Sequence, residues 1–361
     1  MGEPGAPHGA LAVQPWLLVM RATGLTSLAL AAALAACSKS HALAPGASPA
    51  SGSAGPVPTP TGQAASEAPA VAPPAAAAPV DTPAGKLTIA DARRYMVRLI
   101  NRDRATMGLA PVTLDEGPAQ RAGQAHAEDM AKNGYLGHWG SDGSVPEQRF
   151  TEAGGTDMVL ENASCFTDEQ RRTLDAAPTI DPKNVEQTED MFFHEQPPHD
   201  GHRKNILKAW HKTVGVGVAQ PVATQTEIPV PCFSQEFVDD YGTYVAVPSK
   251  VKVGDPLHVE GTVAAPATFA GVGLARVETP KPIAVSELNK RRSYPVPAPY
   301  QMYWPPGFQT PIVVKVSGGR FSIDVPVSDG GKPGLYEVSV WASVPGSPDL
   351  MMVSLRTLTA R

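Results

Sequence analysis

The sequence has no excess of positive charge, few cysteines and no apolar run long enough to span a membrane comfortably. Its 30 basic residues are outnumbered by 35 acidic ones in 361, which gives a net charge of −5. A nucleic-acid binder needs a basic face, so we expect no nucleic-acid partner. The longest apolar run, near the N-terminus, is shorter than the roughly 20 residues that a membrane span requires. The three cysteines allow one disulfide at most.

Proline is abundant and clustered, with 38 residues in the chain. Together with the length, which is too great for one ordinary domain, this clustering predicts folded parts separated by an extended segment. We place the boundaries at four segments: 1–37, 38–86, 87–242 and 243–361.

Residues 1–37 carry the pattern of a signal peptide. Arg21 precedes an apolar run of small residues over 24–36. The run ends in Leu-Ala-Ala-Cys, which resembles the lipobox of bacterial lipoproteins and implies acylation of Cys37. An ordinary secretory signal with an incidental cysteine is the alternative. Met1 and Met20 are both candidates for the start of translation. Ser38, which follows the predicted lipidated cysteine, favours the outer membrane or the cell surface as the place of the anchor.

Residues 38–86 consist almost entirely of Ala, Pro, Gly, Ser and Thr. Such a composition cannot fill a core and favours extended polyproline II conformations. We expect a disordered tether that separates the folded parts from a lipid surface.

Residues 87–242 show both helical and strand periodicities. Thr88 with Asp91 resembles a capping box at the start of a helix that ends near Gly108, and a second helix is expected over 118–133. Residues 214–218 and 232–238 are typical of strands. The order of these elements predicts an α+β sandwich.

A series of motifs in this segment resembles the CAP (SCP-like) superfamily of cysteine-rich secretory, antigen 5 and pathogenesis-related proteins. The resemblance covers about 150 residues and implies a CAP-type α-β-α sandwich. The matching blocks, in order, are residues 99–104, Gly108-Leu109, 126–131, 135–138, 142–144, Arg149-Phe150, Ala153-Gly154, Glu161-Asn162, 201–207, 214–217 and 235–237.

The same resemblance implies a cleft that holds two histidines and two acidic residues. Carried over by motif, these are His138, Glu161 and His202, with Glu195 as the second acid and Glu189 as the fallback. Imidazole nitrogens and carboxylate oxygens suit Zn²⁺, so a divalent metal is the cofactor we consider. The alternative is that the histidines are hydrogen-bonded structural residues.

Other chemistry finds less support in the sequence. His194-Glu195 with His199 lacks the i, i+4 histidine spacing of zinc proteases, and two prolines interrupt it. No Gly-x-Ser-x-Gly motif marks a nucleophile. Cys165 and Cys232 are expected to form a disulfide in an oxidising compartment, with two buried thiols as the alternative. His126 lies on an apolar helix face and is expected in the core.

Residues 243–361 alternate short β-rich runs with turn residues, which predicts an all-β, immunoglobulin-like sandwich. Tyr336, after Pro-Gly-Leu, resembles a tyrosine corner. Tyr300, Tyr303 and Trp304 fall in a Pro-rich loop over 294–311, and either form a binding surface or pack on their own sandwich.

We therefore expect a monomeric, extracytoplasmic lipoprotein, lipid-anchored to a bacterial membrane, whose CAP domain acts as a binding or interaction module. Its ligand would be a metal, a lipid, a peptide or cell-wall material. The alternatives are a hydrolase that uses the same cleft, and a structural envelope protein with a vestigial cleft. The sequence favours a non-enzymatic role.

Overall fold

The structure is a computed structural model that describes residues 79–225, 229–291 and 293–361. These residues belong to one compact unit. The predicted signal peptide, the predicted lipidation site at Cys37 and the predicted tether up to residue 78 lie outside the described residues. Among the described helices, none is long and apolar enough to cross a membrane.

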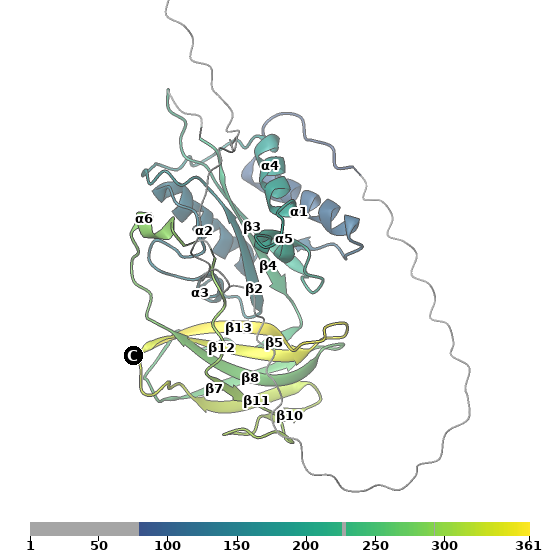
Figure 1. Ribbon diagram of the computed structural model, residues 1–361, viewed down its shortest axis with the longest axis vertical. Helices are drawn as coiled ribbons and strands as arrows, with labels where there is room; N and C mark the ends of the chain where they lie inside the picture. Colours follow the sequence, from purple (N-terminus) through teal and green to yellow (C-terminus); the bar gives the residue numbers. More distant parts are fainter. Residues whose placement is uncertain (1–78, 226–228, 292) are drawn as a thin grey trace, which may run out of the picture. The chain divides into compact units, whose positions relative to one another are not determined.

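The first folded part is a four-stranded sheet between two layers of helices, as the α-β-α prediction requires (Figure 1). The strands are ordered β1-β3-β4-β2, with β1 parallel to β3 and the other pairs antiparallel. The elements are α1 (Ile89–Thr106), β1 (Thr113–Leu114), α2 (Pro118–Asn133), α3 (Pro146–Glu152), β2 (Met158–Ser164), α4 (Pro182–Phe193), α5 (Gly201–Ile206), β3 (Thr213–Ala219) and β4 (Cys232–Asp239).

The first helix begins as the sequence predicts. Thr88 is the N-cap of α1, and its hydroxyl oxygen accepts a hydrogen bond from the Asp91 backbone nitrogen at 3.1 Å. The same hydroxyl donates to Asp91 Oδ2 at 2.6 Å, so Asp91 fills the role of the usual Glu or Gln. The second helix, α2, has the predicted bounds, and Gly134 ends it in the left-handed conformation.

Strand β3 explains why two different helical layers fit on one sheet. Its valines at 214, 216 and 218 are fully buried and pack in the same core cluster as α1 and α4. Its glycines face α2: a Cβ at Gly215 would lie 2.2 Å from the Ala119 carbonyl carbon, and one at Gly217 would lie 2.1 Å from the Gly123 carbonyl oxygen. Valine and glycine therefore alternate along β3: the valines fill the core on one face, and the glycines let helix α2 approach closely on the other.

The ordered part begins before the predicted boundary at residue 87. Leu87 and Ile180 pair through two backbone hydrogen bonds of 2.8 Å. Val80 packs against the core cluster, and Thr82 Oγ1 donates to Glu186 Oε1 at 2.6 Å. The end of the predicted tether is therefore docked along α4.

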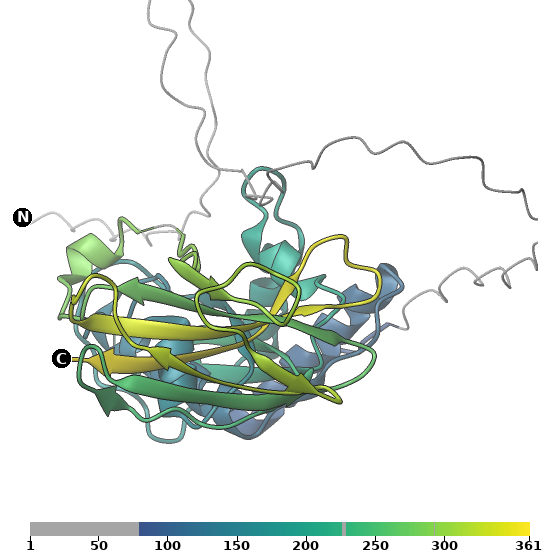
Figure 2. The same cartoon turned by 90° about the horizontal axis from the view of Figure 1, so that it is seen from below.

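The second part is a β-sandwich, as predicted. One sheet has the order β10-β11-β7-β5 and the other β6-β13-β12-β8-β9, and a single apolar core lies between them. Figure 2 shows these strands in green to yellow. The elements are β5 (Gly242–Tyr244), β6 (Lys250–Val251), β7 (Pro256–Val263), β8 (Thr268–Val277), α6 (Val285–Leu288), β9 (Gln301–Tyr303), β10 (Lys315–Ser317), β11 (Arg320–Pro326), β12 (Gly334–Ser343) and β13 (Met351–Ala360).

Two predictions for this part can be checked directly. The Tyr336 hydroxyl donates to the Lys332 carbonyl oxygen at 2.6 Å and accepts from the Asp329 backbone nitrogen at 2.9 Å, which confirms a tyrosine corner. Tyr303 is 3% exposed and belongs to the sandwich core. Tyr300 is half-exposed and donates to the Ser328 carbonyl oxygen. The proposed aromatic surface therefore loses Tyr303 to core packing.

Candidate functional site

The four residues carried over from the family line one cleft. The cavity has a volume of about 350 Å³, and His138, Glu161, Glu195 and His202 are all among its lining residues. They come from four different segments: the turn after α2, strand β2, the loop after α4 and helix α5. The fold therefore gathers them, although nothing in their spacing along the chain requires it.

Within the cleft the four side chains form two imidazole–carboxylate pairs. His138 Nδ1 lies 2.9 Å from Glu161 Oε1, and His202 Nδ1 lies 2.6 Å from Glu195 Oε1. Glu195 Oε2 also accepts the His202 backbone N–H at 2.9 Å, so Glu195 fixes both the ring and the start of α5. The centroids of the two imidazole rings are 6.5 Å apart.

This pairing determines which ring nitrogens are available to a ligand. A carboxylate accepts a proton, so each imidazole donates through Nδ1 and keeps its lone pair on Nε2 when it is neutral. Within the described part of the chain, neither Nε2 atom has a hydrogen-bond partner. The arrangement matches the carboxylate–histidine pairs that orient metal-binding imidazoles in other proteins.

The donor set fits a metal only in part. Among the described residues, no group of three or more His, Cys, Asp or Glu side chains is placed to hold an ion. Because Glu161 and Glu195 are engaged with imidazole Nδ1 atoms, they are positioned to orient the histidines. The residues that could hold a divalent cation are His138 and His202, with the remaining positions left for water or a ligand.

Glu161 forms an ion pair with Arg149, a residue that the site prediction did not include. Arg149 Nη2 donates to Glu161 Oε2 at 2.6 Å and to the His138 carbonyl oxygen at 3.0 Å. Burial alone would raise the pKa of Glu161, but the charges of Arg149 and the neighbouring histidines outweigh it and hold that pKa well below its ordinary value. Arg149 belonged to one of the family-like blocks, and that was the signal that could have identified it.

Two more buried titratable groups surround this pair. Glu236 is opposite Glu161 in the sheet, and burial followed by repulsion from Glu161 raises its pKa well above the ordinary value. His126 is fully buried, as predicted, and its Nε2 donates to the Gly137 carbonyl oxygen at 2.8 Å. Burial, and then the charge of Arg149, lowers the pKa of His126 to about 4. Both shifts favour the neutral form of the group, beside the ion pair of Glu161 with Arg149.

The structure supports Glu195 over Glu189 as the second acid of the cleft. Glu189 does not line the cavity. It is fully buried on α4, where its Oε2 accepts a hydrogen bond from Gln235 Nε2 at 2.6 Å. Burial raises the pKa of Glu189 to about 8.

The zinc-protease alternative has no structural basis. Helix α4 ends at Phe193, with His194 as its C-cap, and the Pro197–Pro198 peptide that follows is cis. The His194 side chain is 62% exposed, and its Nδ1 contacts Asp190. His199 lines the cleft, but from a loop.

Three residues of the C-terminal half of the chain also line the cleft. Ser293, Tyr294 and Val296 line the cavity together with the residues above. They belong to the segment between β8 and β9, residues 278–291 and 293–300, which we call the strap. The sequence predicted a long loop over 294–311, which overlaps only the end of the strap, and gave no sign that the segment would pack on the first part.

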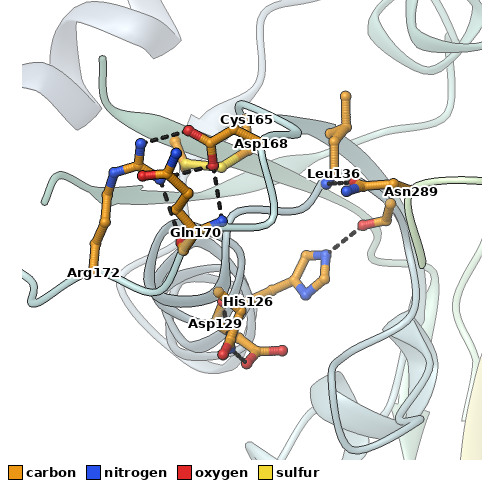
Figure 3. The surroundings of a disulfide bond; sticks show 11 residues. His126, Asp129, Leu136, Cys165, Asp168, Gln170, Arg172 and Asn289 are labelled. Atoms are coloured by element: carbon orange, nitrogen blue, oxygen red, sulfur yellow. Dashed lines mark hydrogen bonds and ion pairs between the residues drawn. A yellow bond between two sulfur atoms is a disulfide. The ribbon is translucent and has the colours of Figure 1, made fainter. Parts of the chain in front are cut away.

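Cys165 and Cys232 form the predicted disulfide, next to the end of α2 and the turn that leads to His138 (Figure 3). It joins the end of β2 to the start of β4 across 67 residues, with the Cα atoms 4.4 Å apart. The bridge therefore secures β2, the strand that carries Glu161, at the edge of the sheet.

The comparison with protein families agrees with the fold of the first part. Residues 97–228 match the family model described as CAP, cysteine-rich secretory protein family. One similar solved structure is the 1.5 Å crystal structure of an extracellular protein containing an SCP domain from Bacillus anthracis str. Ames, which is 17% identical with a TM-score of 0.30. The match covers 42% of this chain and 41% of that one, so less than half of that protein's length is matched. No curated protein matches the chain. The chain therefore contains a CAP domain of the cysteine-rich secretory protein family, followed by an immunoglobulin-like β-sandwich.

Proposed function

We propose that the chain is a cell-envelope lipoprotein whose CAP domain is a binding module, and that its cleft holds a divalent cation, with Zn²⁺ as the best match. The observation that carries the proposal is the pairing of each cleft imidazole with a carboxylate through Nδ1. This pairing selects the tautomer that presents Nε2, which is the form that binds a metal. With two protein ligands, the ion would keep positions open for a further ligand.

The disulfide supports the extracytoplasmic location. Disulfides persist in oxidising compartments and are rare where thiols are kept reduced. The signal-like run and the lipobox at Cys37 would deliver the chain to such a compartment and anchor it there. Metabolic labelling with a radioactive fatty acid tests the anchor: label should enter the wild-type chain and not the Cys37→Ala variant. Equal labelling of both would remove the lipid anchor from the proposal.

Calorimetric titration of the purified protein with zinc at neutral pH tests the cleft. The wild type should bind, and the double variant His138→Ala with His202→Ala should lose binding. A matched control, His194→Ala with His258→Ala, removes two histidines that are 62% and 53% exposed, and it should bind as the wild type does. Glu195→Gln should weaken binding by roughly 10–100-fold, because it removes the carboxylate that orients His202.

The result also separates the competing functions. If titration of the wild type with zinc releases or absorbs no heat, the proposed metal site is wrong. Turnover of casein or peptidoglycan that disappears with Glu161→Gln would instead favour a hydrolase that uses the same cleft. Neither binding nor turnover would leave a structural envelope protein with a vestigial cleft.

A further inference from the structure

The strap is fixed to the CAP domain at several independent points. The Ile283 backbone nitrogen donates to the Ser141 carbonyl oxygen at 3.0 Å. The Leu136 backbone nitrogen donates to Asn289 Oδ1, also at 3.0 Å (Figure 3). Leu288 is fully buried in a cluster that includes residues Met130, Tyr135 and Ala163 of the CAP domain. A segment held by hydrogen bonds and apolar burial together has a fixed place on the surface.

The CAP domain is shaped to receive this segment. Gly143 has a φ of +88°, and a Cβ there would lie 2.2 Å from the Lys281 carbonyl oxygen. A side chain at position 143 would therefore collide with the backbone of the strap. The turn that follows His138 thus contains a glycine where the strap crosses it.

At the cleft itself, Tyr294 links the strap to the CAP domain. Its hydroxyl donates to Glu147 Oε1 on α3, and its ring stacks edge-on against Trp139 with centroids 5.0 Å apart. Arg291 covers the Trp139 ring at 4.8 Å from its centroid. Glu147 and Tyr294 both line the cavity, so these contacts place the strap directly beside the cleft histidines.

The lining of the cavity limits the charge of a ligand. It includes three glutamates and three histidines, and none of the described residues that line it is Lys or Arg. Arg149 lies behind Glu161 and is occupied by it. Among the described lining residues, an anionic head group would find no Lys or Arg, whereas a cation would find the Glu195 carboxylate and the imidazole nitrogens.

We propose that the strap is a wall of the CAP cleft, so that the ligand site is built from both halves of the chain and accepts a compact cationic ligand rather than an anionic one. This inference rests on the proposed function, because it concerns the same cleft. The strap shields His138 and His202 from one side, and displacing it opens them to solvent.

The test is the rate at which diethyl pyrocarbonate modifies His138 and His202 in the full chain, with the modified peptides identified by mass spectrometry. Two variants disturb the strap by different means: Gly143→Ala through the clash with Lys281, and Tyr294→Ala through loss of the Glu147 and Trp139 contacts. Both should raise the rate by roughly threefold or more, since local opening exposes the rings.

The matched controls should react at the wild-type rate. Gly154→Ala introduces the same strain at a φ of +93°, but its nearest neighbour is an Arg121 side-chain atom 3.9 Å away. Tyr300→Ala removes a tyrosine at the last position of the strap, whose hydroxyl donates to the Ser328 carbonyl oxygen of the sandwich and not to the CAP domain. If both strap variants react as slowly as the wild type, the strap is not a wall and the inference is wrong.

The charge preference is tested with the same readout. Butyltrimethylammonium should protect His138 and His202 from modification, and butyrate of equal chain length should not. Equal protection by both, or protection by butyrate alone, would overturn the cationic assignment. All of these rates are measured on metal-free protein, so a chain that binds no zinc yet shows the predicted rates would refute the proposed metal site and leave the wall intact.

Discussion

Arg149 Nη2 lies 2.6 Å from Glu161 Oε2, and the same nitrogen donates to the carbonyl oxygen of His138. The Arg149 guanidinium thus links the Glu161 carboxylate to the backbone of His138, the residue whose imidazole that carboxylate orients. Because Glu161 and Arg149 are both almost fully buried, neither charge has water as an alternative partner.

Removing Arg149 should therefore destabilise the domain strongly. Arg149→Met leaves a buried carboxylate at Glu161 without its counter-charge, and we expect a loss of about 3–5 kcal/mol in the free energy of unfolding. Urea unfolding followed by circular dichroism measures it. Arg121→Met is the control, since Arg121 is exposed and donates only to the Ala153 carbonyl oxygen. Equal stability of the two variants would show that the pair does not hold the site.

The glycines of β3 give a second prediction. Gly217→Ala places a Cβ 2.1 Å from the Gly123 carbonyl oxygen, so α2 must move away from the sheet, at a cost of about 1–3 kcal/mol or more. Gly201→Ala in α5 meets nothing within 4 Å and should change stability by less than about 0.5 kcal/mol. Thermal unfolding of both variants makes the comparison. A Gly217→Ala protein as stable as Gly201→Ala would contradict the close-approach explanation.

Much of the fold could be predicted because its signals are local. The Thr88–Asp91 cap, the α2 bounds and the Tyr336 corner each depend on residues within a few positions of one another. The docking of Val80 and Thr82 along α4 could not be predicted, because a Pro-rich segment has no periodicity that indicates where it meets a surface. The strap was missed for the same reason.

The disulfide should contribute measurably to stability. Replacing both Cys165 and Cys232 by serine opens a loop of 67 residues and should cost about 2–5 kcal/mol. A reducing agent should lower the melting temperature of the wild type towards that of the double variant and leave the variant unchanged. If reduction shifts both proteins equally, the stabilisation comes from elsewhere.

Stability should also fall as the pH rises, because of a buried carboxyl on the sandwich. Burial, and then the neighbouring Glu147 carboxyl, raises the pKa of Glu337 from 4.5 to about 10. The carboxyl of Glu337 binds its proton more tightly in the folded state than in the unfolded state. Its contribution to the free energy of unfolding is therefore complete below about pH 4.5 and is lost as the pH rises towards 10.

The Glu337→Gln side chain is neutral at every pH, so this variant should lose less stability than the wild type as the pH rises. We expect it to be more stable than the wild type by about 1–3 kcal/mol at pH 9, with little gain at pH 4. Glu278→Gln, at an exposed position, should show no such dependence. Parallel stability curves for wild type and Glu337→Gln between pH 4 and pH 9 would rule out the raised pKa.

The sequence predicted which residues form the candidate site but not how their side chains are paired. His138, Glu161, Glu195 and His202 do share a cleft, and the family resemblance was enough to select them. It could not show that the glutamates bind the imidazole Nδ1 atoms, because hydrogen-bond partners depend on distances between segments far apart in the chain. For the same reason, the Arg149 contact emerged only from the structure.

Anomalous diffraction at the zinc edge, from crystals of the protein soaked in zinc, tests the central claim most directly. We expect one anomalous peak in the cleft, about 2.0–2.1 Å from Nε2 of both His138 and His202. Density for Glu161 and Glu195 should remain on the Nδ1 side of each ring. Crystals that show no peak in the cleft, or a peak that contacts neither imidazole, would contradict the account.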